Sequence, residues 1–255
     1  MRDEVITALQ KIAAEKNCRF LFAAESGSRA WGFASPDSDY DIRAIYVKPE
    51  SWYWDISDNK RDTIEAQLPG DLDISAWELR KALQLFSKCN PSLNEWLGSP
   101  IIYYAEDEFL TTMQELMPKF FNPTRAGFHY LTLAQRAWES INADHEITLK
   151  KLFYAQRGLF CSMWSALFKT MPPTEFEKLL IPELLPEKIL KLVRDLITQK
   201  IQAKEKATIL VPDILWNFYN EQRENLLQKL PLLECRAHDR SILGEILRNY
   251  VQADL

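Results

Sequence analysis

The chain has 255 residues, of which 47% are hydrophobic and 26% are charged, an ordinary composition for a folded protein that buries a sizeable core. Its net charge of -5 gives no overall positive field that would mark nucleic acid as a partner. The charge is uneven, because residues 1–125 hold 14 Lys and Arg against 20 Asp and Glu, whereas residues 126–255 hold 17 against 16. The acidic first half suits a metal site better than a groove for a phosphate backbone, although surface solvation gives the same count.

The first 17 residues have apolar side chains at helical spacing and two early acids, which predicts an amphipathic helix over residues 2–16. They contain no uninterrupted apolar run and so predict neither a secretion signal nor a membrane span. We therefore expect a soluble, cytoplasmic protein with no membrane partner. The cysteines at positions 18, 89, 161 and 235 form no CxxC pair, which argues against a zinc site and favours buried thiols over disulfides.

Two runs rich in β-branched and aromatic residues follow, and they predict strands over residues 19–25 and 40–48. The sequence "RDTIEAQLPGDLDISAW" then predicts a strand, a Pro-Gly-Asp turn and another strand. From Glu78 onward the spacing of apolar residues is helical, and strand patterns have run out by about Tyr104. The first part of the chain therefore combines strands with helices.

Beyond Glu106 every segment has a helix-length pattern, interrupted at prolines. The sequence therefore predicts an α/β head over residues 1–105 followed by an all-helical domain over residues 106–255. No internal repeat or low-complexity segment is present.

The stretch "ESGSRAWGFASPDSDYDIR", residues 25–43, carries the clearest chemical pattern. Asp39, Asp41 and Arg43 alternate with other residues, so a strand projects all three from one face. Two carboxylates on one face repel each other unless a cation neutralises them, and such a pair is typical of a Mg²⁺ site. Gly27 and Ser28 follow a strand directly, where glycine lets the backbone approach a phosphate.

A third carboxylate is available in "DLDISAW". Asp73 lies between Leu72 and Ile74 on a predicted strand and would allow the site to hold two metal ions. Asp71 is two residues earlier and on the same face, although it is expected in the turn. Either carboxylate can complete the site.

A Gly-Ser pair, a D-x-D on a strand and an Asp between hydrophobic residues on another strand resemble the nucleotidyltransferase superfamily related to DNA polymerase β. More closely, "GSRAWGFASPDSDYDIRAIYV", "DISAWELRKALQLFSKCNPSLNEWLGSPIIYY" and "KKLFYAQRGLF" resemble the predicted nucleotidyltransferases called YcgL-like or RNA-ligase-associated (RlaP). The resemblance covers roughly residues 20–170.

This resemblance implies an α+β fold, in which a small mixed-sheet nucleotidyltransferase head precedes an all-α helical domain. It implies that Gly27 and Ser28 touch the triphosphate of the nucleotide. It also implies that Asp39 and Asp41 bind metal ions, with two Mg²⁺ ions expected, and that Asp73 completes the site.

Basic residues near these motifs have two interpretations. Arg29 and Arg43 either contact phosphate or pair with the aspartates, and Arg43 favours pairing because it shares their face. Lys150, Tyr154 and Arg157 are spaced i, i+4 and i+7, so a helix places them on one side. They form either a solvated basic edge or a grip on nucleotide phosphates, and their position in the family pattern favours the grip.

Other polar residues give weaker signals. Glu95 is a candidate pocket residue, although helix caps and a buried Trp96 explain most of its surroundings. His129, His145 and His238 form no ligand-spaced pair, so the "AHDR" sequence near the C-terminus does not predict a metal-dependent phosphohydrolase. The many aromatic residues favour a packed core over a platform for stacking bases.

These features together predict an enzyme. An acceptor hydroxyl attacks the α-phosphate of an NTP, with ATP expected, while Mg²⁺ holds the attacking and leaving oxygens and pyrophosphate departs. The alternative is a nucleotide-binding regulatory or antitoxin-like module without transfer activity, which has no need of a third carboxylate.

The acceptor is left open by the sequence. The resemblance ranks an RNA 3′ end first, no DNA is expected, and a metabolite or a protein side chain fits equally well. Four basic residues lie on one predicted helix, namely Lys150, Lys151, Arg157 and Lys169. They allow only a few phosphate contacts, so we expect recognition of no more than the terminal nucleotides of an RNA.

Overall fold

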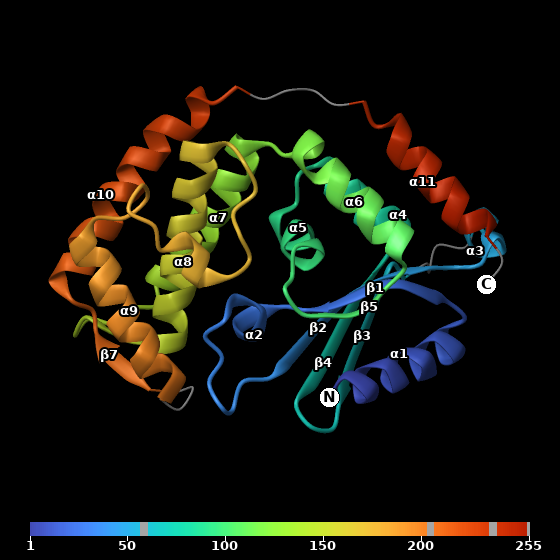
Figure 1. The fold of residues 1–255 in the computed structure, drawn as a ribbon, viewed down its shortest axis with the longest axis horizontal. Coiled ribbons are helices and arrows are strands. Elements are labelled where there is room, and N and C mark those ends of the chain that lie inside the picture. Colours follow the sequence, from blue (N-terminus) through green and yellow to red (C-terminus); the bar gives the residue numbers. More distant parts are fainter. Residues whose placement is uncertain (57–60, 203–206, 235–238, 254–255) are drawn as a thin grey trace. The chain divides into compact units, whose positions relative to one another are not determined.

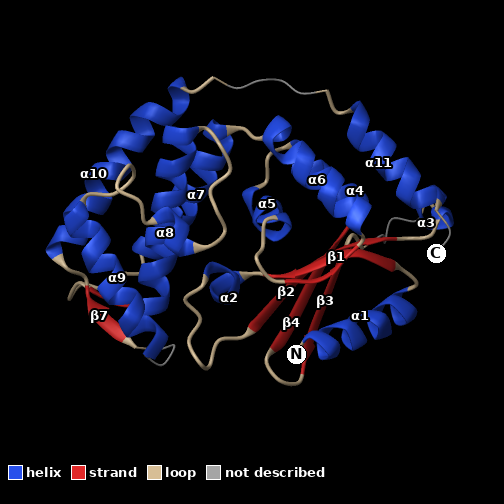
Figure 2. Cartoon of the chain, viewed as in Figure 1, coloured by secondary structure: helices blue, strands red, loops and turns tan. Residues whose placement is uncertain are grey.

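The structure is a computed structural model that describes residues 1–56, 61–202, 207–234 and 239–253. The chain forms two compact units. The sheet unit comprises Met1–Ala30, Asp39–Phe120 and Ala237–Leu255, and the helical unit comprises Trp31–Ser38 and Phe121–Arg236. Figure 1 follows the chain through its elements, and Figure 2 separates helices from strands.

The sheet unit is built on a mixed five-stranded sheet with the order β3-β4-β2-β1-β5. Its strands are β1 (Arg19–Glu25), β2 (Tyr40–Val47), β3 (Thr63–Leu68), β4 (Leu72–Glu78) and β5 (Ile102–Ala105). The β2–β4 pair is parallel and the other pairs are antiparallel. The predicted mixed sheet is confirmed, with a fifth strand where the strand patterns were expected to end.

Helices cover both faces of this sheet. They are α1 (Arg2–Lys16), α2 (Gly27–Trp31), α3 (Glu50–Trp54), α4 (Leu79–Ser87), α5 (Pro91–Leu97), α6 (Asp107–Phe120) and α11 (Ser241–Gln252). One core cluster includes apolar residues of α1 and the even-numbered residues Ile42, Ala44 and Tyr46 of β2. The other joins Ile45 and Val47 of β2 to apolar residues of α4, α5, α6 and α11. Figure 1 shows α1 and α4 on opposite sides of the strands.

This alternation fixes the face on which the polar motif lies. Side chains two apart on a strand share a face, so Asp41 and Arg43 lie on the same face as Ile45 and Val47. The buried half of that face packs against helices, whereas Asp41 and Arg43 are only partly buried. The start of β2 therefore presents polar side chains at the uncovered part of an otherwise covered sheet.

The helical unit contains α7 (Pro123–Trp138), α8 (Leu149–Phe168), α9 (Glu187–Gln202), α10 (Asp213–Lys229) and two short 3-10 helices (Phe176–Leu179 and Leu230–Leu232). Helices α7 and α8 approach closely at Gly158, where an added Cβ would lie 2.8 Å from the Ala134 nitrogen and the Tyr130 oxygen. The prediction that everything beyond Glu106 is helical is wrong in one place. Strands β6 (Glu146–Thr148) and β7 (Thr208–Leu210) pair antiparallel, and three residues each are too few to show a strand pattern.

The segment Trp31–Ser38 belongs to the helical unit although it runs from the last residue of α2 toward β2. Phe33 packs against Phe153 and Phe176, with ring centroids 5.1 and 5.4 Å apart. The Lys200 Nζ donates a hydrogen bond of 3.1 Å to the Ser35 Oγ. The units also differ from the predicted division at residues 105 and 106, because α6 and α11 contribute to the core of the sheet unit.

Cys18, Cys89 and Cys161 are buried thiols that form no disulfide, as expected, and Cys235 lies outside the described residues. Within the described ranges, no helix has both the length and the apolar character needed to cross a membrane.

Candidate functional site

Asp41 and Asp73 are direct neighbours on the parallel strands β2 and β4. The guanidinium of Arg43 joins them, with its Nη2 2.8 Å from Asp41 Oδ1 and its Nη1 2.9 Å from Asp73 Oδ2. The side chains are 29% exposed for Asp41, 33% for Asp73 and 20% for Arg43. The pairing favoured for Arg43 is confirmed, and the two carboxylates share one cationic partner on a partly open face.

This donor set fits a hard divalent cation. Mg²⁺ typically takes one or two protein carboxylates and fills its remaining positions with water and substrate phosphates. Asp41 and Asp73 provide the two carboxylates, and a positive charge already lies between them. In the part of the chain that the structure describes, no group of three or more His, Cys, Asp or Glu side chains is placed to hold a metal ion, so the candidate set is the pair Asp41 and Asp73.

Asp39 lies one residue before β2 and is exposed, so it is not part of the strand from which it was expected to project. Its carbonyl oxygen accepts a hydrogen bond of 3.0 Å from the Nε of Arg29. The Arg29 guanidinium also stacks on the ring of Tyr40, 3.7 Å from its centroid. Arg29 therefore ties the end of the loop to the start of the strand, and the metal role of Asp39 stays a prediction.

Gly27 lies against the carboxylate of Asp41. Its φ is +60°, and a Cβ added to it would lie 2.2 Å from Asp41 Oδ2. Just before it, the backbone N–H of Ser26 donates a hydrogen bond of 2.8 Å to the carbonyl of Asp41. The structure thus brings the Gly27-Ser28 motif and Asp41 together, and the site requires glycine here for both its conformation and its small size.

Of the two candidates for the third carboxylate, Asp73 is the one beside Asp41. Asp71 is exposed in the turn after Gly70, with a φ of +58°. Its carbonyl accepts a hydrogen bond of 2.8 Å from the Tyr40 N–H. The geometry therefore favours Asp73 over Asp71.

Glu25 is a residue of this site that the sequence patterns missed. Its carboxylate is buried, with the residue only 1% exposed. Oε1 accepts a hydrogen bond of 2.8 Å from the Asp41 N–H, and Oε2 accepts one of 2.5 Å from the Tyr103 hydroxyl. Burial raises the pKa of the Glu25 carboxyl above its usual range. The negative charge of Asp41 also raises this pKa, whereas the hydrogen bonds from the Tyr103 hydroxyl and the Asp41 N–H lower it. The available signal was a single acid at the end of the apolar run "RFLFAAE".

Glu95 is 9% exposed on α5, within the sheet unit. Its neighbours have the structural roles that the sequence suggested. The Asn90 side chain caps α5 by accepting from the Leu93 N–H at 3.1 Å, and Trp96 packs on Trp77 with centroids 3.9 Å apart. A pocket role for Glu95 stays a prediction.

Lys150, Tyr154 and Arg157 lie on α8 in the helical unit and differ in exposure. Lys150 is half-buried and Tyr154 is exposed, but Arg157 is only 4% exposed. The Arg157 guanidinium lies 4.3 Å from the ring centroid of Trp31, and its Nη2 donates to the Thr174 carbonyl at 3.3 Å. A solvated basic edge therefore does not describe Arg157, and nucleotide binding by these three residues stays a prediction.

Lys169 and the three histidines discussed from the sequence are all more than 50 positions from Asp41 and Asp73 along the chain. Lys169 is the C-terminal cap of α8, beyond its last helical residue. His129 and His145 each pack against an aromatic ring, those of Tyr130 and Trp216. His238 lies outside the described residues.

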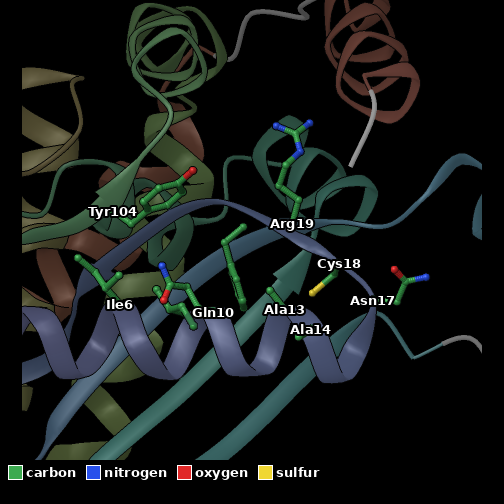
Figure 3. A pocket seen from close by; sticks show the side chains of 10 residues that line it. Ile6, Gln10, Ala13, Ala14, Asn17, Cys18, Arg19 and Tyr104 are labelled. Carbon is green, nitrogen blue, oxygen red and sulfur yellow. The ribbon is translucent and has the colours of Figure 1, made fainter.

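A cavity of about 440 Å³ lies elsewhere in the sheet unit. It is lined by α1, by the start of β1 and by Tyr104 of β5 (Figure 3). Figure 3 shows Ile6 and Gln10 on the turns of α1 near Tyr104, with Cys18 at the far end of the helix. None of the residues that carry the candidate chemistry lines it.

Comparison with known proteins places the chain in a family. Residues 1–249 match the family RlaP, described as the RNA repair pathway DNA polymerase beta family. The chain is 36% identical over 254 residues to the "Uncharacterized protein YcgL" of Bacillus subtilis (strain 168), covering 99% of this chain and 97% of that protein.

Among solved structures, the chain is similar to a nucleotidyltransferase-like protein from Exiguobacterium sibiricum 255-15, at 11% identity over 98% of this chain and 89% of the other. The TM-score of 0.34 is too low for this likeness to add to the assignment. The family match spans almost the whole length and includes the strands that carry Asp41 and Asp73. The chain therefore belongs to RlaP, the RNA repair pathway DNA polymerase beta family.

Proposed function

We propose that the protein is a metal-dependent nucleotidyltransferase that moves a nucleoside monophosphate from an NTP to an acceptor hydroxyl. The observation that carries this proposal is the side-by-side position of Asp41 and Asp73, with Gly27 in contact range of Asp41. Membership of a family described as DNA polymerase beta-related supports it, because polymerases transfer nucleoside monophosphates from NTPs. ATP is the proposed nucleotide.

The proposed reaction is one displacement at phosphorus. A bond forms between the acceptor oxygen and the α-phosphorus, the bond from the α-phosphorus to the bridging oxygen breaks, and pyrophosphate leaves with that electron pair. The acceptor proton passes to a nearby base, for which Asp73 is the candidate because it is a partly exposed carboxylate beside Asp41. Gly27 and Ser28 would hold the triphosphate by their backbone at the start of α2.

Asp41 and Asp73 would hold Mg²⁺, with Asp39 as a further carboxylate from the loop. When bound, Mg²⁺ supplies positive charge to the transferring phosphate and its leaving group. Without a metal ion, the single positive charge of Arg43 would offset one of the two negative charges of Asp41 and Asp73. Its guanidinium has to release at least one of them for a metal ion to take the same oxygens.

The proposed acceptor is an RNA 3′ end, which is supported by the RNA repair description of the family. Of the four basic residues singled out on or next to α8, Lys151 and Lys169 are exposed, Lys150 is half-buried and Arg157 is buried, which leaves two or three for phosphate contacts. We therefore propose that only the terminal nucleotides are recognised. A binding slope of roughly -0.7 per phosphate contact on a log-log salt plot would then correspond to two or three contacts.

The test is incubation with each labelled NTP, Mg²⁺ and short RNAs ending in a 3′ hydroxyl or a 3′ phosphate. We expect label on the hydroxyl-ended RNA and release of pyrophosphate, with both lost in Asp41→Ala and in Asp73→Asn. Asp71→Asn is the matched control, because this exposed turn residue lies two positions from Asp73 and should retain transfer. Unchanged transfer in Asp41→Ala would refute the assignment, and tight NTP binding without any labelled acceptor would favour a nucleotide-binding module.

A further inference from the structure

The backbone of Asp41 is held at both of its polar groups. Its carbonyl accepts a hydrogen bond of 2.8 Å from the N–H of Ser26, one residue beyond the end of β1. Its N–H donates a hydrogen bond of 2.8 Å to the side-chain Oε1 of Glu25, the residue at which β1 ends before the chain turns into α2 at Gly27.

Glu25 is itself fixed from several directions. The Tyr103 hydroxyl donates to Glu25 Oε2 at 2.5 Å, and Tyr103 is 6% exposed on β5. The Ser99 hydroxyl donates to the Glu25 carbonyl at 2.7 Å, and the Glu25 N–H donates to the Ile101 carbonyl at 2.9 Å. The carboxylate that holds Asp41 therefore has little freedom to move.

The strand register gives Glu25 no direct access to a ligand of Asp41. Glu25 pairs with Ile42 across β1 and β2, and neighbouring strand partners share a face. Ile42 and Tyr103 belong to the core on the α1 side of the sheet, whereas Asp41 projects from the opposite face. Glu25 thus acts from behind the site, through the peptide unit of Asp41.

Burying a carboxylate is energetically unfavourable, because desolvation disfavours its charged form unless hydrogen bonds compensate. We infer that Glu25, held by Tyr103, is a positioning residue that fixes the peptide unit of Asp41 and so aims its carboxylate at the nucleotide site. This inference rests on the proposed nucleotidyl transfer. It deepens that proposal, because it assigns a role to two residues that touch neither metal nor nucleotide.

The same unit offers a matched control. Glu78 is also 1% exposed and accepts a 2.5 Å hydrogen bond from a tyrosine hydroxyl, that of Tyr53. Its carboxylate accepts from the backbone N–H groups of Arg80 and Lys81 and so caps α4. Glu78 lies five residues beyond Asp73 on β4, roughly 16 Å along the strand. Changes at Glu78 and Tyr53 therefore disturb a comparable Glu–Tyr pair, whose tyrosine is half-buried, without touching Asp41.

The experiment compares E25A, E25Q and Y103F with E78A, E78Q and Y53F in the full chain. It measures kcat, KM for ATP, Mn²⁺ affinity in the absence of nucleotide, and the thermal midpoint Tm. We expect E25A to lower kcat by about 100-fold, the effect of misplacing a reacting group by ~1 Å. KM for ATP should change less than about 3-fold, because the proposed triphosphate contacts at Gly27 and Ser28 would be unaltered.

E25Q should recover most of the lost kcat, since its amide oxygen still accepts from the Asp41 N–H and its amide nitrogen can donate to Tyr103. The control variants should lower Tm by a similar amount but leave kcat and Mn²⁺ affinity close to those of the unaltered protein. A loss of Tm in E25A without any change in kcat or Mn²⁺ affinity would overturn the inference. Equal losses of kcat in E25A and E78A would overturn it too.

Two further outcomes keep the inference separate from the proposed function. If the unaltered protein transfers no nucleotide, the proposed reaction fails, and Mn²⁺ affinity alone tests the positioning of Asp41. If E25A does not fold, Y103F decides, because it removes one hydroxyl and keeps the bond between Glu25 and Asp41. Y103F should then lower kcat several-fold more than Y53F does, and equal values for the two variants would contradict the inference.

Discussion

Replacing Gly27 with Ala should damage the candidate site in two separable ways. The backbone at Gly27 has a φ of +60°, a left-handed conformation that costs an L-residue about 1–2 kcal/mol. The added Cβ would also lie 2.2 Å from Asp41 Oδ2 and 3.1 Å from Asp41 Cγ, so the carboxylate has to move. Forcing extra atoms into a packed position typically costs about 1–3 kcal/mol more.

Gly70→Ala separates these two contributions. Gly70 has a φ of +83° in the β3–β4 turn, but no atom lies within 4 Å of the position that a Cβ would take there. Both substitutions reduce the entropy of the unfolded chain by a similar amount, which stabilises by about 0.4–1 kcal/mol in each case. Gly70→Ala should therefore report the backbone strain and the unfolded-chain entropy without a steric clash, and Gly27→Ala should be less stable than it by about 1–3 kcal/mol.

Urea unfolding of the two variants gives the free energies, and a second pair of variants tests the cause. In an Asp41→Ala background the Asp41 Oδ2 and Cγ atoms are gone, so adding Gly27→Ala should cost no more than Gly70→Ala does. Nucleotidyl transfer should be retained in Gly70→Ala and lost in Gly27→Ala. Equal stability and equal transfer in Gly27→Ala and Gly70→Ala would refute the contact between Gly27 and Asp41 as the reason for glycine.

Three further outcomes follow from single contacts. Arg43→Met should lower the free energy of unfolding by about 1–3 kcal/mol in urea titrations without divalent ions, because two adjacent carboxylates lose their shared charged partner, and added Mg²⁺ should restore part of it. Arg157→Met should lower the free energy of unfolding by about 1–2 kcal/mol through loss of the buried contact with Trp31, while the same change at exposed Arg194 should stay within about 0.5 kcal/mol. Burial raises the pKa of the Cys18 thiol, so less reactive thiolate exists at pH 8; peptide-resolved alkylation should be slow in the folded protein and fast in urea, and equal rates would contradict this burial.

Much of the sheet unit could be predicted from local patterns. Strands 19–25 and 40–48 were predicted within one residue of β1 and β2, because buried strands are continuous apolar runs bounded by turn residues. The pairing of Asp41 with Asp73 could not be predicted from residue alternation, because alternation within a strand does not show which strands are neighbours. It depends on the parallel register of β2 and β4.

The parts that escaped prediction depend on contacts between distant residues. Glu25 shows no pattern, because its partners Asp41 and Tyr103 are 16 and 78 positions away. Arg157 has the spacing of an exposed helix face, yet Trp31 from a segment far earlier in the chain covers it. Strands β6 and β7 are stable only as a pair and are too short to recognise singly.

The assignment of Trp31–Ser38 to the helical unit has a consequence for how this protein can change over evolution. The chain passes from one unit to the other four times, at 30/31, 38/39, 120/121 and 236/237. No single break in the gene therefore yields either unit intact. A fusion or recombination event at residue 120 would leave Phe33 without Phe153 and Phe176, and would remove α11 from the core that it completes. Such a chimera would expose apolar surface in both halves, which favours inheritance of the two units as one block.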